Sequence, residues 1–321
     1  MKLLGAASLV AVMAASAGCG SIAAEIGSGQ SSHARSWSSS SAKQTLPLPK
    51  SVVRRLPPGV FYFLAGPNFA SCNIWEVSRA GDEIELTRNK VGYGISMFGA
   101  SRAGVVMADA SSGLDELARL TDAGAVFLGH ARASSPSIST SGQIISSRSP
   151  ATTAGVFDLV ERNTWSAADE VLYSSRAAIT MNVWGPGGSI AILAGGHPPG
   201  TAGPHPRLLV RNKNGRVTVV RTGLGDSLGG VIWGPHARDL AAISWSGAGE
   251  LIKPSGRRVQ LPNGWRPAAW SPSGGRLLVQ GPHRALGLWS PSRPGIVKAI
   301  GQVTQGVDVA NFIWLSGPVR L

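Results

Sequence analysis

One short unit recurs along this chain and constrains its fold more than any other feature. Its clearest copy runs from Pro267 to Gly281: an apolar segment ends at Trp270, a turn follows, and a second apolar segment returns from Arg276. The turn has the sequence Ser-Pro-Ser-Gly-Gly, in which proline presets φ and glycine permits a positive φ. The unit therefore predicts two antiparallel strands joined by a tight turn.

Weaker copies of the unit lie before and after this one. Trp184, Trp233 and Trp314 each end an apolar segment that precedes a turn, and copies near Phe98 and Ile138 lack tryptophan. Together with Trp270 these positions define a repeat of roughly 40–45 residues, a period typical of β-propeller blades made of short strands. A single four-stranded blade cannot bury both of its faces, so blades pack face to face around an axis.

The segment from Trp270 to Val279 resembles the repeat of TolB-like, WD40-like β-propellers, whose unit is close to W-S-P-D-G-x-x-[IL]-[AV]-[FV]. The match is partial at the other three tryptophans. Ser273 stands where the family usually has Asp, which implies a weaker side-chain cap for this turn. The resemblance covers roughly residues 59–321 as a repeat pattern, and it implies a fold and commonly a role in protein contact, but no specific activity. Tryptophans at equivalent points favour packing between blades over ligand stacking.

The apolar segments assign strands to six blades, with five or seven as the alternatives. Val60 to Leu64 begins the first blade without an inner strand before it, whereas Phe312 to Leu321 supplies an inner strand without room for more. We therefore predict an all-β, six-bladed propeller over residues 51–321, closed by the C-terminal strand, because closure removes exposed strand edges. Leu114 to Leu120 could form a helical turn, and we take it as the third strand of the second blade.

The N-terminus predicts a targeting segment. Lys2 supplies a positive start, and Leu3 to Ala15 is an apolar run too short to span a membrane as a helix. The Ser-Ala-Gly-Cys sequence that ends at Cys19 resembles a bacterial lipobox, with serine in place of the usual leucine. The resemblance implies a signal peptide of residues 1–18 and lipidation of Cys19, and an ordinary secretory peptide is the alternative. Lipidation would hold the protein on the extracytoplasmic face of a bacterial cell membrane.

Residues 19–50 predict a flexible tether, because a segment dominated by serine and glycine cannot bury a core. The remaining residues, 51–321, are numerous enough to form a core of their own. The chain has two cysteines. If Cys19 is lipidated, Cys72 has no partner within the chain, and we expect no disulfide to stabilise the propeller.

Charge is distributed unevenly along the chain. The formal net charge is +13, and residues 201–321 hold 15 Lys and Arg against 4 Asp and Glu. A cationic surface attracts polyanions within a Debye length. No nucleic-acid-binding motif is present, so we expect a monomer whose partner is another envelope protein or an anionic envelope polymer. Solvation of an arginine-rich surface is the alternative. The candidate binding residues are Arg207, Arg211, Lys213, Arg257, Arg258 and Arg284.

Metal-binding motifs of hydrolytic enzymes are missing from the sequence. It has no H-E-x-x-H and no Cys/His cluster. The letters G-x-S-x-G occur once, from Gly225 to Gly229, but the all-β repeat pattern predicts no helix after them, as a nucleophile elbow would require. We expect no cofactor and no metal, with His197 and His205 as weak metal candidates because they share the Gly/Pro-rich loop of residues 195–206. That loop is either functional or a disordered insertion. We therefore expect a non-enzymatic binding propeller; the alternative is a lyase or hydrolase with its active site at the mouth of the central channel.

Overall fold

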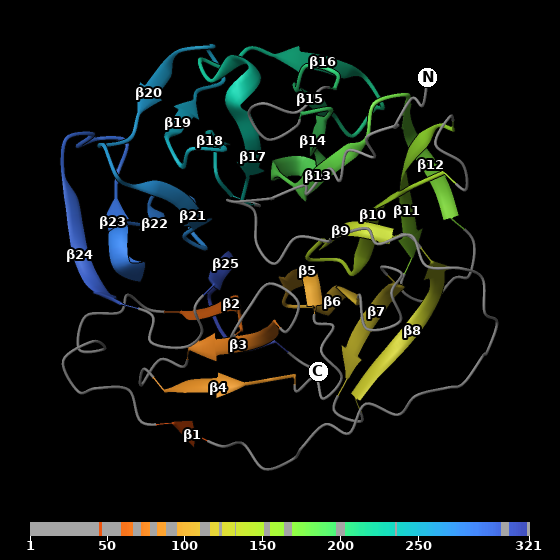
Figure 1. The fold of residues 1–321 in the computed structure, drawn as a ribbon, viewed down its shortest axis with the longest axis horizontal. Helices are drawn as coiled ribbons and strands as arrows, with labels where there is room; N and C mark the ends of the chain where they lie inside the picture. The colour runs from red at the N-terminus through yellow and green to blue at the C-terminus, as the bar shows by residue number, and fades with distance from the viewer. Residues whose placement is uncertain are drawn as a thin grey trace, which may run out of the picture.

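The structure is a computed structural model in which six antiparallel sheets are arranged radially around a central axis (Figure 1). The predicted all-β, six-bladed propeller is therefore confirmed. Within the described part of the chain, no helix is long and apolar enough to cross a membrane. The signal peptide, Cys19 and most of the tether lie outside this part. The structure describes residues 45–46, 59–66, 72–77, 82–87, 95–109, 116–121, 124–131, 133–150, 155–163, 169–196, 203–234, 236–302 and 308–319.

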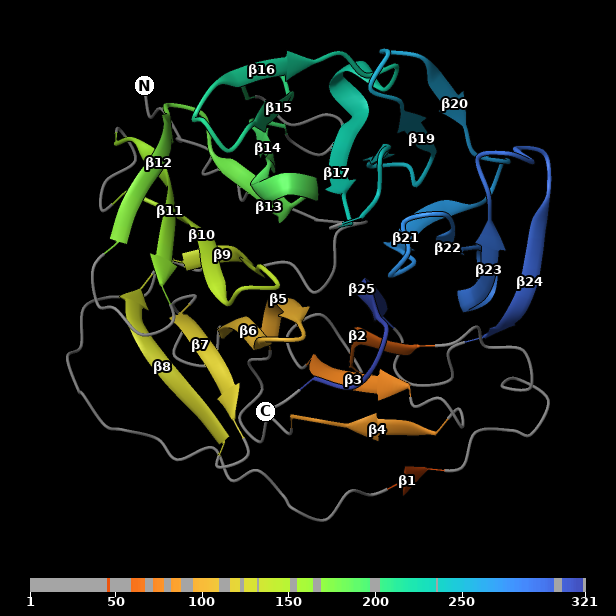
Figure 2. The same ribbon diagram turned by 180° about the vertical axis from the view of Figure 1, so that it is seen from behind.

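Each blade consists of strands that follow one another outward from the axis, and blade 1 has a fifth, outermost strand (Figures 1 and 2). Three short 3-10 helices, η1 (Pro186–Gly188), η2 (Gly225–Ser227) and η3 (Pro282–Arg284), lie in the connections. From inside to outside, the strands are β25 (Asp308–Leu315), β2 (Val60–Gly66), β3 (Asn73–Val77), β4 (Glu83–Glu85) and β1 (Thr45–Leu46) in blade 1; β5 (Ile95–Ser101), β6 (Gly104–Asp109), β7 (Glu116–Thr121) and β8 (Gly124–Ala131) in blade 2; β9 (Ala133–Ile138), β10 (Gln143–Arg148), β11 (Phe157–Asn163) and β12 (Asp169–Ser175) in blade 3; β13 (Ile179–Trp184), β14 (Ile190–Ala194), β15 (Arg207–Arg211) and β16 (Val217–Val220) in blade 4; β17 (Leu228–Ile232), β18 (Leu240–Ser244), β19 (Gly249–Ile252) and β20 (Arg258–Gln260) in blade 5; and β21 (Arg266–Trp270), β22 (Leu277–Gln280), β23 (Ala285–Trp289) and β24 (Val297–Gln302) in blade 6.

The C-terminal strand closes the ring, as the sequence predicts. β25 pairs antiparallel with β2, and Phe61 faces Trp314 with ring centroids 4.9 Å apart. Beyond the strand, the backbone N–H of Val319 donates a hydrogen bond to the Tyr62 hydroxyl at 2.9 Å. Burial and the nearby Glu76 carboxylate raise the pKa of Tyr62 above its usual range. The first and last segments of the propeller are thus joined within one sheet.

The tryptophans pack between neighbouring blades, which confirms the sequence interpretation. Trp270 is 4% exposed and lies in a cluster with side chains of blades 5 and 6, and Trp314 is 5% exposed in a cluster of blades 1 and 6. A Cβ at Gly185 would lie 2.3 Å from the ring of Trp233 in the next blade. Trp184 packs among side chains of blades 3 and 4. Each indole therefore fills the space between its own blade and the preceding one.

The structure also settles the form of two short segments, β7 and the turn after Trp270. The ambiguous segment of blade 2 is the strand β7, without helix. In the turn after Trp270, the Ser271 hydroxyl accepts a hydrogen bond from the N–H of Arg276 at 3.0 Å, and the Ser273 hydroxyl lies 3.3 Å from that of Ser271. A pair of serines therefore closes this turn in the place of the family's Asp.

Two findings differ from the sequence interpretation of the N-terminal half. Thr45 and Leu46, expected within the flexible tether, form the outer strand β1 and pair with β4. Cys72, expected to have no partner, is fully buried and disulfide-bonded. The only other cysteine of the sequence is Cys19, which lies outside the described residues. A two-residue strand and a long-range bond carry no local sequence signal, so neither could be predicted from neighbouring residues.

Candidate functional site

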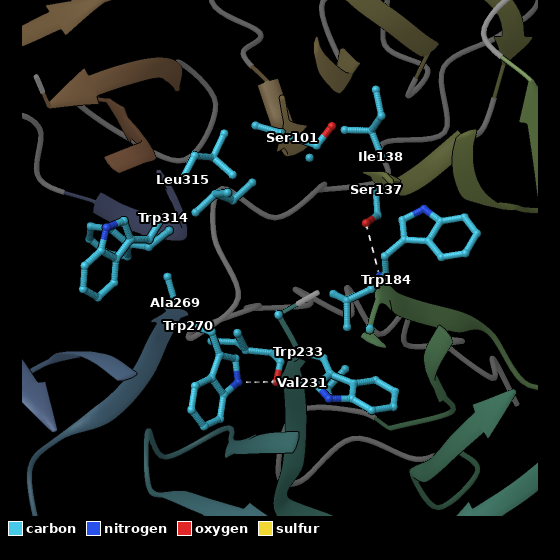
Figure 3. Close-up of a pocket in the computed structure, with 18 of the residues that line it drawn as sticks. Ser101, Ser137, Ile138, Trp184, Val231, Trp233, Ala269, Trp270, Trp314 and Leu315 are labelled. Carbon is cyan, nitrogen blue, oxygen red and sulfur yellow. Dashed lines mark hydrogen bonds between the residues drawn. The ribbon is translucent and has the colours of Figure 1, made fainter. Parts of the chain in front are cut away.

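A channel runs through the centre of the propeller. It has a volume of about 1090 Å³, and the inner strands of all six blades line it (Figure 3). Each inner strand runs from one mouth of the channel to the other. In blades 2 to 6 a turn there leads to the second strand of the blade, and in blade 1 the C-terminal strand β25 ends there. We call the end that carries these turns the turn mouth and the other end the opposite mouth. A channel of this size suits a ligand that reaches several blades at once.

The turn mouth is lined by hydroxyl groups that join neighbouring blades. Arg102 of blade 2 donates from Nε and Nη2 to the Ser316 hydroxyl, at 3.2 and 2.6 Å. The Ser101 hydroxyl donates to the carbonyl oxygen of Ser139 in blade 3 at 2.8 Å. These bonds link the inner ends of neighbouring blades. Other polar lining residues at this mouth are Thr140, Ser141, His236, Ser271 and Ser273.

The opposite mouth contains a guanidinium group beside an amide. Arg266 donates from Nε and Nη2 to Oε1 of Gln280, at 2.9 and 2.5 Å. Burial lowers the pKa of Arg266, because desolvation disfavours its charged form. The Ser135 hydroxyl donates to the carbonyl oxygen of Thr180 at 2.7 Å and joins blades 3 and 4 at this end. The mouth is thus polar and has a positive charge.

Asn182, on β13, is the most unusual polar residue of the channel lining. Asn182 is 2% exposed, and among the described residues neither its amide nitrogen nor its amide oxygen has a hydrogen-bond partner. Leaving a buried polar group unsatisfied costs about 1–3 kcal/mol, so the group calls for an explanation. Both amide atoms are covered by neighbouring atoms, so a ligand in the channel would reach them only if the side chain turned toward it. The amide could then donate to and accept from a peptide group of that ligand.

Sequence reasoning did not single out Asn182. The signal was present, since this residue is the amide in a strand with the sequence Ile-Thr-Met-Asn-Val-Trp. Its significance depends on whether neighbouring strands provide a partner, and that information is tertiary. The repeat pattern marks the tryptophans instead, and these pack between the blades.

Among the described residues that line the channel there is no Asp or Glu, and the only titratable side chains are Arg102, Arg266 and His236. They come from three blades and lie at both mouths. The carboxylate of Glu161 reaches the lining only indirectly, by accepting a hydrogen bond from Gln143 Nε2 at 2.5 Å. Burial and the neighbouring Glu170 raise the pKa of Glu161. This lining offers hydrogen bonds and apolar contacts, but no carboxylate positioned for acid–base catalysis.

The candidate cations do not form one cluster. None of the six lines the channel. Lys213 and Arg257 are exposed in turns at the turn-mouth side. At the other side, Arg207 begins β15 and Arg284 ends η3. Arg211 donates from Nε to the carbonyl oxygen of Leu172 at 3.2 Å and joins blades 4 and 3. Arg258 lies beside the loop that contains Gly223: a Cβ added at Gly223 would lie 2.8 Å from Nη1 of Arg258.

The two candidate metal ligands are His197 and His205. His197 lies outside the described residues. His205 is highly exposed, and its Nδ1 lies 2.7 Å from Oδ1 of Asp226 at η2. Within the described ranges no three His, Cys, Asp or Glu side chains gather as metal ligands would. The His205–Asp226 pair ties the end of the 195–206 loop to the next connection.

The fold and its lined channel define a six-bladed β-propeller. No protein-family profile matches the sequence, and no curated protein matches it. TolB from Acinetobacter baumannii is similar in structure, with a TM-score of 0.60 and 12% identity over 81% of this chain and 67% of TolB. An oligogalacturonate lyase from Vibrio parahaemolyticus has a TM-score of 0.49 and 12% identity, covering 77% of this chain and 76% of the lyase. The propeller domain of the Trilobed protease from Pyrococcus furiosus has a TM-score of 0.43 and 12% identity, covering 64% and 70%. At such identities the likeness shows the fold alone.

Proposed function

We propose that this chain is a non-enzymatic binding propeller of the bacterial cell envelope, which holds an extended segment of another envelope protein in its central channel. The observation that carries this proposal is the buried Asn182 amide, which has no hydrogen-bond partner among the described residues. A peptide backbone supplies both a donor and an acceptor, and it fits a lining of hydroxyls, carbonyls and apolar side chains. The opposite mouth, with Arg266 beside Gln280, is the side from which the segment enters.

The envelope location rests on the N-terminal sequence. A signal peptide of residues 1–18, a lipid on Cys19 and a serine-rich tether would hold the propeller at the extracytoplasmic face of a membrane. The TolB-like fold is compatible with that location. An anionic envelope polymer is the second candidate partner, and the exposed cations of blades 4 to 6 favour it. A lyase or hydrolase at the channel mouth finds no support in the described lining, which has no carboxylate.

Site-specific photo-crosslinking in living cells tests the proposal. A photoreactive amino acid at Met97, which lines the channel near the opposite mouth, is expected to capture a protein of one defined mass. The same group at Val219, 59% exposed on the outer strand β16, serves as the matched control and is expected to capture none. Adding Asn182→Leu to the Met97 variant is expected to abolish capture. Equal capture at both positions, or none at Met97, would rule out a channel ligand.

A further inference from the structure

The two faces of the propeller disc differ in how they are built. Figures 1 and 2 view the disc from its two faces. In blades 2 to 6 the turn between the first and second strands and the turn between the third and fourth strands lie on the same face, because consecutive strands are antiparallel; in blade 1 the end of β25 and the start of β2 lie at this face. We call this the turn face; it surrounds the turn mouth of the channel. The remaining connections lie on the opposite face.

The turn face concentrates positive charge. Eight described lysines and arginines lie in its turns, on blades 2, 4, 5 and 6, and seven of them are exposed. The described acidic residues of the same turns are Asp82 and Asp239. No ion pair involves any of the eight cations within the described residues. The cations are Arg102, Lys213, Arg216, Arg238, Lys253, Arg257, Arg276 and Arg293.

These side chains are not needed to close the turns that carry them. The turn around Lys213 is closed by Asn212, whose Oδ1 accepts from the N–H groups of Asn214 and Arg216 at 3.0 Å each. The turn of residues 253–257 is closed by backbone bonds, in which the N–H of Lys253 donates to the carbonyl oxygen of Arg257 at 2.9 Å. Like charges on one face repel each other and destabilise the fold slightly. Arg102 does bind the Ser316 hydroxyl, but the cations of these two turns are retained on this face without a role in closing the turns.

We propose that the turn face docks on an anionic membrane surface, so that the opposite mouth of the channel points away from the lipid. The cations encircle the turn mouth over four blades, and only Arg102 lines the channel. Charge spread over one face of a disc matches a planar surface, whereas a linear polymer requires charges along a groove. A tether made of residues 20–44 reaches about 90 Å at most and by itself permits every orientation. The charge of the turn face selects one orientation. This inference goes beyond the proposed function and does not depend on which segment occupies the channel.

Vesicle binding by the full chain tests the inference. Binding to vesicles of 70% phosphatidylcholine and 30% phosphatidylglycerol is compared with binding to pure phosphatidylcholine, since insertion of the N-terminus contributes to both. Neutralising one cation at a membrane surface weakens binding roughly fivefold. The variant Arg216→Gln, Arg257→Gln, Arg293→Gln, with changes in three turns of the turn face, is therefore expected to reduce the preference for anionic vesicles by about 100-fold.

A matched control removes the same charge from the other face. Arg176→Gln, Arg207→Gln and Arg221→Gln change three exposed arginines at the opposite face, two in connections and Arg207 at the start of β15. This triple variant is expected to keep the preference within about fivefold of the wild type. Unchanged thermal midpoints of both variants show that they fold. Raising the salt concentration to about 1 M, where the Debye length is about 3 Å, is expected to remove the preference.

Three outcomes would overturn the inference. The first is an equal loss in both triple variants, which would mean that only net charge matters. The second is a wild-type protein without preference for anionic vesicles. The third is a turn-face variant that loses binding to long-chain polyphosphate while the wild type ignores anionic vesicles, which would identify this face as a polymer site.

Discussion

Gly274 shows how a single residue fixes the fit between two blades. It has a positive φ of 71°, and a Cβ there would lie 2.2 Å from the carbonyl oxygen of His236 in blade 5. Gly256 has a similar φ of 80° but nothing within 4 Å. We predict that Gly256→Ala costs about 1 kcal/mol of unfolding free energy from backbone strain alone. Gly274→Ala is expected to cost about 3 kcal/mol or more, because backbone must also move. Urea denaturation measures both, and equal losses would contradict the role of the contact.

Asn182 supports a second prediction at this scale. Asn182→Leu is expected to raise the free energy of unfolding by about 1–2 kcal/mol, because it removes a buried amide without a partner. Asn212→Leu is the matched control: it removes the acceptor of two backbone N–H groups and is expected to lower stability by about 1–2 kcal/mol. Thermal and urea denaturation of the purified variants give both values. A destabilised Asn182→Leu would show that the amide serves the fold and would weaken the case for a channel ligand.

Residue types differ in how far the sequence determines their role. The position of Trp270 at the end of a repeat predicts its burial between blades, since every propeller must fill that space and indole fills it. Asn182 has no such signature, because its importance depends on whether the neighbouring strands β9 and β17 provide hydrogen-bond partners for its amide. The arginines illustrate the same limit. The sequence shows how many arginines there are, but it does not show their roles. Arg211 donates a hydrogen bond to a carbonyl oxygen of blade 3, whereas Arg257 is exposed in a turn.

At the scale of the strands, ring closure by β25 is the decisive element. Removal of residues 308–321 would leave β2 without its inner partner and expose Phe61 and Tyr62, both at most 2% exposed in the closed ring. We predict loss of the cooperative unfolding transition and aggregation of this truncated chain. Removal of Arg320 and Leu321 alone is the control, because the described contacts of β25 and Val319 remain. Size-exclusion chromatography and thermal denaturation compare the two, and a monomeric, cooperatively folded 308–321 deletion would contradict closure.

Tyr62 makes this closure sensitive to alkaline pH. Its pKa is raised in the folded state, so the folded protein keeps the phenol proton that the unfolded chain loses above pH about 10. The stabilisation is complete below that pH and declines as pH rises further. We predict that between pH 10 and 11.5 the wild type loses up to about 1.4 kcal/mol per pH unit more than Tyr62→Phe does. Urea denaturation across this range checks the difference, and parallel profiles would contradict it.

The strands were predictable where apolar residues recur at the blade period, and this covers the inner and second strands of all six blades. Closure followed from a counting argument, because one blade lacked an inner strand and the C-terminus had one to spare. β1 escaped prediction since two residues beside a serine-rich segment carry no periodicity. The channel itself was predictable only as a consequence of the fold. Its lining depends on which faces of six twisted strands meet, and no single strand specifies that.

Positive charge is distributed unevenly in two respects: along the sequence, and between the two faces of the disc. The excess of basic residues after residue 201 is a property of the sequence, whereas their division between two faces of a disc follows from the alternation of turns. Turn sequences rich in Lys, Arg, Ser and Gly recur on the turn face because the same blade plan repeats. The proposed entry of a protein segment at one mouth and the proposed docking of the cationic face on lipid at the other are therefore compatible in one molecule.

The proposed lipid anchor and the disulfide of Cys72 would compete for one sulfur atom. Lipid attachment would use the sulfur of Cys19, and a disulfide between Cys72 and another residue of this sequence would use the same atom, because the sequence has no third cysteine. We predict that protein extracted from membranes carries the acyl chains on Cys19, whereas protein made in an oxidising medium without lipidation carries the disulfide. Intact mass under non-reducing conditions separates the two: the first is heavier by the lipid, and the second gains 2 Da on reduction. Membrane-extracted protein that lacks acyl chains and contains the Cys19–Cys72 bond would refute the anchor, and the orientation of the disc would then depend on the charge of the turn face alone.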